Sequence, residues 1–481
     1  MSYNHRTTVV YKKEGTYEKE LTELNDLIWD AAELKFREFR SAEAMAGLLE
    51  RHGFRITRGL AHMPTAFLAE YGTGKPVIAI LGEYDALSGL SQEAGTFRPL
   101  PRKDCANGHG CGHSLLGTAA AGAGLLLKAY LEDHPGKGTV RVYGCPAEEG
   151  GSGKTYMVRE GLFQDVDGAL TWHPGTQNEV MVGSNQANIQ ASFSFRGRAA
   201  HAAAAPQNGR SALDAVELMD VGVNYLREHM ADYERVHYAI LDAGGVSPNV
   251  VQPKAEVLYL IRSRTNEETR RLYERVVNIA RGAALMTETE MTVRFDKAVS
   301  NIIPNRVLGQ VLHDAMERVG VPVRTGEEKA FLGQFQELAG EERVLKDPGM
   351  APFPDPELRE ELIRKDPSGA FLLPYQPTSI SAMGSSDTGD VSWITPLGQF
   401  AAACFAIGTS AHSWQWVAQG KGSAALKGCF FAARVLAEGA KILYGQPDVL
   451  AAAKAELQKR LSGRTYRCPI PPEVMPRAYG K

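Results

Sequence analysis

Two histidines and one cysteine lie within the five residues from His109 to His113, and glycines stand on both sides of the cysteine. Cys111 and His113 carry the sulfur and nitrogen atoms that zinc and similar divalent ions bind. Glycine lets the backbone turn sharply and bring side chains to one point. The stretch by itself suits a metal-binding loop and a tight turn around a buried thiol equally well.

Four more side chains could complete such a site. Glu148 and Glu149 are adjacent, and two like charges side by side are unfavourable unless cations neutralise them. If one carboxylate binds a metal, the other is free to take a proton from water. His173 and His412 add two imidazoles. The alternative interpretation is an acidic turn in solvent at residues 148–149, and His412 alone would be an ordinary loop histidine.

The stretch Gly153-Lys154-Thr155 resembles the end of a phosphate-binding P-loop. That motif requires a glycine five positions before Gly153, where this chain has Glu148. Carboxylates at 148 and 149 would repel phosphate groups. The sequence therefore argues against nucleotide binding.

Short apolar runs place the candidate residues at the ends of strands. An unbroken apolar run is typical of a strand buried on both faces of a parallel sheet. Helical spacing between the runs predicts an open, mostly parallel α/β sheet with helices on both faces. Ligands bind beyond the carboxyl ends of such strands, so we expect the side chains after each run to converge. The runs are residues 77–81, 139–143, 169–172 and 400–407, followed by Glu83 and Asp85, by 148–149, by His173, and by His412.

A second pattern, β-α-β-β-α-β, occupies residues 188–300 and is typical of a ferredoxin-like unit. We therefore expect a discontinuous main domain of residues 1–187 and 301–481, with 188–300 inserted into it. Residues 326–385 are rich in proline and in charged residues, and they predict an irregular, partly helical excursion. The edge strands of a small open sheet need cover, which is a hint of dimerisation.

The composition narrows the class of protein. The 481 residues suit two domains, and a net charge of −3 without a basic run gives no sign of nucleic-acid binding. The N-terminus has no apolar leader region and no stretch predicts a membrane span, so a cytoplasmic protein is expected. The six scattered cysteines are expected to be free thiols.

In their order and approximate spacing, these motifs resemble the family-20 metallopeptidases. The likeness is to the amidohydrolase branch that cleaves N-acyl amino acids. Longer stretches, such as GHGCGHSLLGTAA, YGCPAEEGGSGKTYMVREG and GDVSW, are similar to a subgroup acting on aminobenzoyl-glutamate. The motifs are Cys111-Gly-His113, Glu148-Glu149, His173-Pro174, Gly197 with His201, and His412.

The resemblance implies a fold and a metal content. It implies a zinc-peptidase-like three-layer α/β sandwich with an inserted α+β ferredoxin-like lid that dimerises. It also implies two divalent metal ions per subunit, zinc or manganese. Cys111 would bridge them, with His113 and Glu149 on one side and His173 and His412 on the others.

The resemblance also implies roles for other residues. Glu148 would be the general base that activates a metal-bridging water, and Asp85 would orient a ligating histidine. His201 would reach into the partner's site and polarise the scissile carbonyl, while Asn249 and Arg262 would lie near the substrate carboxylate. Glu83 and Ser114 stand where relatives have aspartate. His109 and Asp390 receive no role.

The activity expected is hydrolysis of the amide bond of N-acyl amino acids, with aminobenzoyl-glutamate, giving aminobenzoate and glutamate, as the preferred substrate. One alternative is a non-catalytic or co-catalytic subunit of a hetero-oligomeric hydrolase. Another is an amidohydrolase for a different acyl amino acid, such as an indole-acetyl one. The expected assembly is a homodimer through the lid or a heterodimer with a paralogous subunit.

Overall fold

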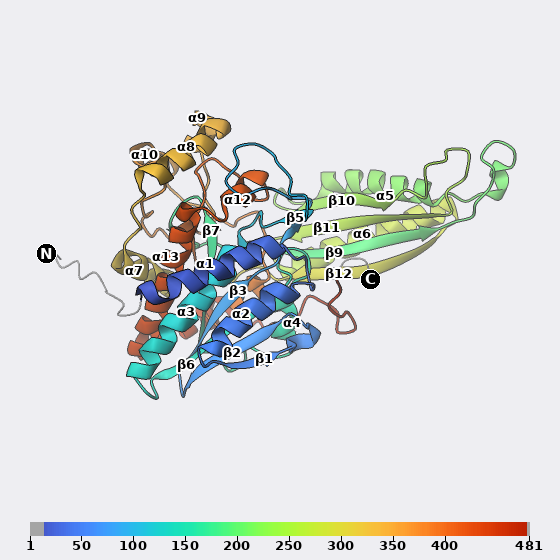
Figure 1. The fold of residues 1–481 in the computed structure, drawn as a ribbon. Helices are drawn as coiled ribbons and strands as arrows, with labels where there is room; N and C mark the ends of the chain where they lie inside the picture. Colours follow the sequence, from blue (N-terminus) through green and yellow to red (C-terminus); the bar gives the residue numbers. More distant parts are fainter. Residues whose placement is uncertain (1–13, 479–481) are drawn as a thin grey trace.

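A seven-stranded sheet forms the centre of the main body (Figure 1), in the order β1-β2-β6-β3-β7-β13-β8. The structure is a computed structural model that describes residues 14–478, so the first thirteen residues, on which much of the expectation of no leader rests, lie outside it. The four central strands are parallel, and the outer ones run antiparallel. The strands are β1 (Arg55–Arg58), β2 (Phe67–Thr73), β3 (Val77–Glu83), β6 (Gly138–Cys145), β7 (Gly168–Gly175), β8 (Glu179–Val180) and β13 (Leu397–Ala403).

The expectation of a mostly parallel sheet is correct for the four central strands only, because the sheet as a whole is mixed. The sequence runs revealed these central strands, whose residues are almost all buried. β1 and β2 were missed because they lie at one edge, where exposed and buried residues are interspersed. The predicted run at 400–407 also extends too far, since β13 ends at Ala403 and the following apolar residues are buried in a loop.

Helices cover both faces of this sheet. The helix α3 is long and apolar enough to cross a membrane, but 78% of the relevant window is buried, as in the core helix of a globular fold. On the other face the side chains of α4 and α11 and of the chain end around Ile470 pack against the strands. The helices of the first face are α1 (Glu14–Ala31), α2 (Phe39–Arg51), α3 (His113–Asp133), α7 (Arg306–Val319) and α13 (Ser423–Gly445); α4 (Gly153–Arg159) and α11 (Thr388–Ser392) lie on the second.

A four-stranded antiparallel sheet extends away from the main body as an arm (Figure 1), with the order β10-β11-β9-β12. Every second residue of β11 is buried, because α5 and α6 cover one face of the sheet. Ser211 and Thr265 cap the two helices through their side-chain oxygens. That the arm is a separate lid and dimerisation domain stays a prediction. Its elements are β9 (Ala187–Arg196), α5 (Ala212–Leu226), β10 (Arg235–Asp242), β11 (Lys254–Ser263), α6 (Asn266–Thr287) and β12 (Glu290–Val299).

The long segment, residues 326–385, begins with three helices and continues without regular structure. Thr325 and Glu328 form a reciprocal capping box at the start of the first helix. The helices are α8 (Gly326–Ala339), α9 (Glu341–Leu345) and α10 (Pro356–Lys365), grouped on one side of the main body (Figure 1). Two further helices, α12 (Trp414–Gln419) and α14 (Pro447–Leu461), complete the main body.

Candidate active site

The five predicted metal ligands lie together beyond the carboxyl ends of the central strands. Their ligand atoms form two groups of three that share Cys111, and within each group the atoms lie within 4.8 Å of one another. The first group is Cys111, His113 and His173, and the second is Cys111, Glu149 and His412. The resemblance had placed His113 with Glu149, whereas the structure groups His113 with His173.

The imidazoles of the first group are fixed by hydrogen bonds on the side away from Cys111. His113 Nδ1 lies 2.9 Å from Asp85 Oδ1, and His173 Nδ1 lies 2.7 Å from the carbonyl oxygen of Pro174. Both acceptors require the proton on Nδ1, so each Nε2 keeps a lone pair for a ligand. His173 Nε2 lies 3.4 Å from Cys111 Sγ.

The Cys111 side chain has the charge of a metal ligand. Burial and the Glu149 carboxylate each raise the pKa of this thiol, but His173 and His113 outweigh them and bring it to about 6. A thiolate, and not a thiol, is the form that binds divalent ions. The Glu149 carboxyl is likewise ionised, because His412 and His113 overcome the effect of burial and lower its pKa to about 2.

Two buried atoms in this cluster make no hydrogen bond: His113 Nε2 and Glu149 Oε1. His113 Nε2 lies 3.1 Å from Glu83 Oε2, and Glu149 Oε1 lies 3.5 Å from His412 Nε2. An unpaired buried polar atom costs free energy unless a ligand satisfies it. Sulfur, imidazole nitrogen and carboxylate oxygen around such atoms fit divalent ions of the zinc or manganese type.

Glu148 lies beside the ligands and is not itself in either of the two groups that share Cys111. Burial raises the pKa of its carboxyl well above the ordinary value, and the nearby Glu83, Asp387 and Glu149 carboxylates raise it further. A carboxyl of this kind holds a proton readily once it has received one.

A buried acid that sequence reasoning missed, Glu38, positions the loop that carries Glu148. Its Oε1 accepts a hydrogen bond of 3.0 Å from the backbone N–H of Ala147, a residue with a left-handed φ of 61°. Thr65 Oγ1 donates to the other carboxylate oxygen at 2.9 Å. No local motif marks Glu38, because its partner lies more than a hundred residues away in the chain.

Lys154, from the P-loop-like stretch, is fully buried behind the site. Its Nζ lies 2.6 Å from Glu83 Oε1 and 2.5 Å from Asp387 Oδ1. The lysine therefore neutralises two carboxylates near Glu148, and its amino group is already engaged.

Of the three predicted residues on the arm, only Arg262 reaches the site of its own chain. Its Nη1 donates to Ser385 Oγ at 2.8 Å, and Ser385 lines the cavity next to the metal ligands. His201 and Asn249 are exposed and do not line this cavity. His201 Nδ1 accepts hydrogen bonds from the backbone N–H groups of Ala203 and Ala204, which leaves Nε2 directed elsewhere.

Asp390 and His109 each have a structural setting. Asp390 is fully buried and accepts hydrogen bonds from Ser300, Thr155 and Tyr466, so it joins the end of the arm to α4 and the chain end. His109 Nε2 lies 2.9 Å from the carbonyl oxygen of Ile28, and burial lowers its pKa to about 3. A neutral His109 therefore ties the ligand loop to α1.

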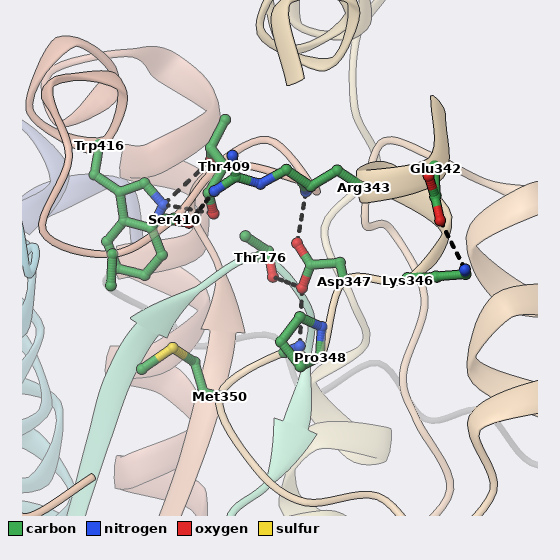
Figure 2. Close-up of a pocket in the computed structure, with 13 residues that line it drawn as sticks. Thr176, Glu342, Arg343, Lys346, Asp347, Pro348, Met350, Thr409, Ser410 and Trp416 are labelled. Carbon is green, nitrogen blue, oxygen red and sulfur yellow. Dashed lines mark hydrogen bonds and ion pairs between the residues drawn. The ribbon is translucent and has the colours of Figure 1, made fainter. Parts of the chain in front are cut away.

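A cavity of about 310 Å³ opens onto the ligands, and a second hollow of about 430 Å³ lies next to it (Figure 2). Met350 and Ala411 line both. The first has the size of a small-molecule site.

Comparison with known proteins adds a family to this geometry. Residues 79–366 match the family described as peptidase family M20/M25/M40. The chain is 48% identical over 458 residues to one of the two p-aminobenzoyl-glutamate hydrolase subunits of Escherichia coli (strain K12), covering 95% of each chain. It is 27% identical over 300 residues to the other of these two subunits, covering 58% of this chain and 68% of that one.

Among solved structures, a dinuclear metal-binding peptidase of the M20 family from Bacillus subtilis has a similar fold. The TM-score is 0.53 at 17% sequence identity, over 89% of this chain and 99% of that one. At this identity the likeness concerns the fold.

Proposed function

The chain belongs to peptidase family M20/M25/M40 and is a hydrolase, and from this premise we propose that it cleaves aminobenzoyl-glutamate to aminobenzoate and glutamate. The observation that carries the proposal is the 48% identity over 95% of the chain to a p-aminobenzoyl-glutamate hydrolase subunit. The side chains grouped at the strand ends support it, because both the candidate base and all the candidate ligands are present.

We propose two divalent ions, zinc or manganese, with Cys111 shared between them. His113 and His173 would complete one set and Glu149 and His412 the other, following the two groups of ligand atoms. When bound, such ions would polarise the amide carbonyl and make a water molecule more acidic.

Glu148 would act twice in the reaction. As a carboxylate it would take a proton from the attacking water, and as a carboxylic acid it would pass that proton to the nitrogen of the leaving amine. Burial, which raises its pKa, supports the second step, because the acid form persists until the amine departs. Asp85 would keep His113 in the tautomer that presents Nε2.

Arg262 would bind the carboxylate of the substrate. It is the cation of the arm that reaches the edge of the cavity, through its contact with Ser385. A guanidinium suits a carboxylate because it can donate two parallel hydrogen bonds. Glutamate as the leaving amino acid supplies such a carboxylate next to the scissile amide.

We propose that His201 and Asn249 act in the site of a partner subunit. Both are exposed on the arm and outside the cavity of their own chain. Large apolar side chains are also exposed on the arm, among them Tyr238 and Ile240 of the edge strand β10. Such a surface suits a homodimer, or a heterodimer with a paralogous subunit. A cytoplasmic location stays a prediction.

The test is to purify the chain alone, measure bound metal, and assay aminobenzoyl-glutamate with a panel of other N-acyl amino acids. We expect the wild type to bind divalent metal and hydrolyse aminobenzoyl-glutamate. Glu148→Ala should keep metal and fold but lose roughly 10²–10⁴-fold in kcat. Glu341→Ala, which changes an exposed glutamate of α9, is the matched control and should behave as wild type.

Two results would contradict parts of the proposal. A wild-type chain that binds no metal and hydrolyses none of the panel is not the catalyst. Activity that appears only after a different subunit is added would replace the homodimer with a hetero-oligomer in which this chain is co-catalytic.

A further inference from the structure

The cavity at the metal ligands has two chemically different ends. At one end are the candidate ligands and Glu148. The other end is built largely from two stretches of the long segment, 350–352 and 382–385, together with Met181 and Ile302. The apolar members of this second end are Met181, Ile302, Met350, Ala351, Pro352 and Ala382.

The charges of the long segment lie elsewhere. Apart from Glu83 and the candidate ligands and base, the residues that line the cavity are uncharged. Arg343 and Lys346 line the neighbouring hollow instead, and Figure 2 shows them there with Met350 and Trp416. Met350 lines both spaces and so separates the charged hollow from the apolar end of the cavity.

Buried ionic contacts hold the apolar wall in place. Glu179 accepts hydrogen bonds from the backbone N–H groups of Met350 at 2.6 Å and Ala351 at 3.3 Å. Arg359 Nη2 pairs with the other oxygen of Glu179 at 2.7 Å. Asp347 accepts from the backbone N–H of Gly408 at 2.5 Å (Figure 2). The wall is therefore anchored to β8 and to the loop after β13.

The second stretch is anchored to the same body. The backbone N–H of Ala382 donates to the carbonyl oxygen of Ser184 at 2.8 Å, and Ser385 Oγ accepts from Arg262. The long segment thus meets the proposed carboxylate-binding arginine at one point and presents apolar side chains next to it. A binding site whose walls are fixed in advance selects ligands by shape.

We propose that residues 350–352 and Ala382, with Met181 and Ile302, form the subsite for the acyl group, and that they select an uncharged, flat acyl group such as aminobenzoyl. The inference rests on the proposed function and extends it to the choice of acyl group. The charged amino acid would be recognised by Arg262, and the apolar end would take the ring. Burying the ring there removes apolar surface from water, which favours it over a small acyl group.

The test narrows the subsite and varies the two halves of the substrate separately. Ala382→Phe adds a ring at the apolar end, and Ile380→Phe adds the same ring at a neighbouring residue that is 52% exposed and outside this cavity. One substrate pair, aminobenzoyl-glutamate and acetyl-glutamate, changes only the acyl group. The other pair, aminobenzoyl-glutamate and aminobenzoyl-aspartate, changes only the amino acid. Metal content and thermal unfolding are measured for each protein.

We expect Ala382→Phe to lower the kcat/KM ratio of aminobenzoyl-glutamate to acetyl-glutamate by about tenfold or more, since pocket shape discriminates acyl groups on this scale. The ratio for the glutamate and aspartate pair should stay as in the wild type, and Ile380→Phe should change neither ratio. If Ala382→Phe fails to fold, Met350→Ala replaces it and should shift the preference toward bulkier acyl groups.

Two outcomes overturn the inference: an unchanged acyl ratio, or a change confined to the amino-acid ratio. A wild-type protein that hydrolyses no substrate of either pair contradicts the proposed function instead. The two failures are therefore distinguishable.

Discussion

Asp85 is hydrogen-bonded to the backbone N–H of Glu149, with 2.9 Å between that nitrogen and Asp85 Oδ2. The other oxygen of the same carboxylate lies 2.9 Å from His113 Nδ1. His113 and Glu149 belong to different groups of candidate ligands, so Asp85 connects the two groups. A short side chain just after the end of β3 thereby sets the position of a residue after β6 and of another at the start of α3.

Asp85→Asn should weaken metal binding without unfolding the protein. A carboxamide offers one acceptor oxygen, so it cannot serve both Nδ1 of His113 and the N–H of Glu149. Removal of such a supporting contact typically costs about 10–100-fold in metal affinity, and we expect a loss of this size here. Titration with a competing chelator measures the change, and Asp232→Asn on the exposed surface of the arm is the control. Equal affinity in Asp85→Asn and wild type would contradict this role.

Lys154→Met should destabilise the fold strongly. The substitution leaves Glu83 and Asp387 buried without their cation, and breaking a buried pair in this way typically costs about 3–5 kcal/mol. Urea denaturation of metal-free protein measures the free energy of unfolding. The double variant Lys154→Met/Asp387→Asn removes one uncompensated charge and should recover part of the loss. No recovery would mean that the lysine acts through packing and not through charge.

Glu38 should make stability depend on pH. Burial and the charge of Asp85 raise the pKa of Glu38 to about 8 in the folded protein, against about 4.5 in the unfolded chain. The folded state therefore holds the proton more tightly, so the stabilisation is complete below about pH 4.5 and is lost as the pH rises through about 8.

Glu38→Gln cannot lose this proton, so the stability difference between wild type and variant should change across that window. The slope would be up to about 1 kcal/mol per pH unit, with wild type losing stability as pH rises. Urea denaturation at a series of pH values from about 5 to 8.5 gives the curve, with Glu33→Gln as a second acid of the same region. Parallel curves for wild type and Glu38→Gln would contradict a protonated Glu38.

The sequence was informative where local pattern and position coincide. Unbroken apolar runs identified the central strands, and the rule that ligands gather at carboxyl ends brought Cys111, Glu149 and His173 together before any coordinates. The β-α-β-β-α-β order of the arm was also correctly predicted from periodicity alone.

What sequence could not supply were contacts between distant segments. Glu38 meets Ala147, and Lys154 meets Asp387, which follows the arm in the chain by many residues. Nothing in the neighbourhood of either residue signals its partner. The apolar wall from Met350 to Pro352 was hidden for the same reason, because a proline-rich stretch has no periodicity that indicates which face it presents.

The role of His201 can be tested by mixing two inactive proteins. Suppose that His201 acts in the partner's site, as its exposure on the arm suggests. A dimer of Glu148→Ala with His201→Ala then contains one site with an intact Glu148 from one chain and an intact His201 from the other. The second site of the same dimer lacks both groups.

Random mixing of equal amounts makes half of the dimers mixed, and each has one working site in two, so about a quarter of wild-type activity should return. Each variant alone should be nearly inactive. Exchange is achieved by co-expression with two different affinity tags, and the mixed dimer is purified through both, which raises the expected value to about a half. If His201 instead serves its own chain, neither site of the mixed dimer is complete and activity stays at the level of the single variants. A copurified dimer without activity would therefore contradict the trans arrangement.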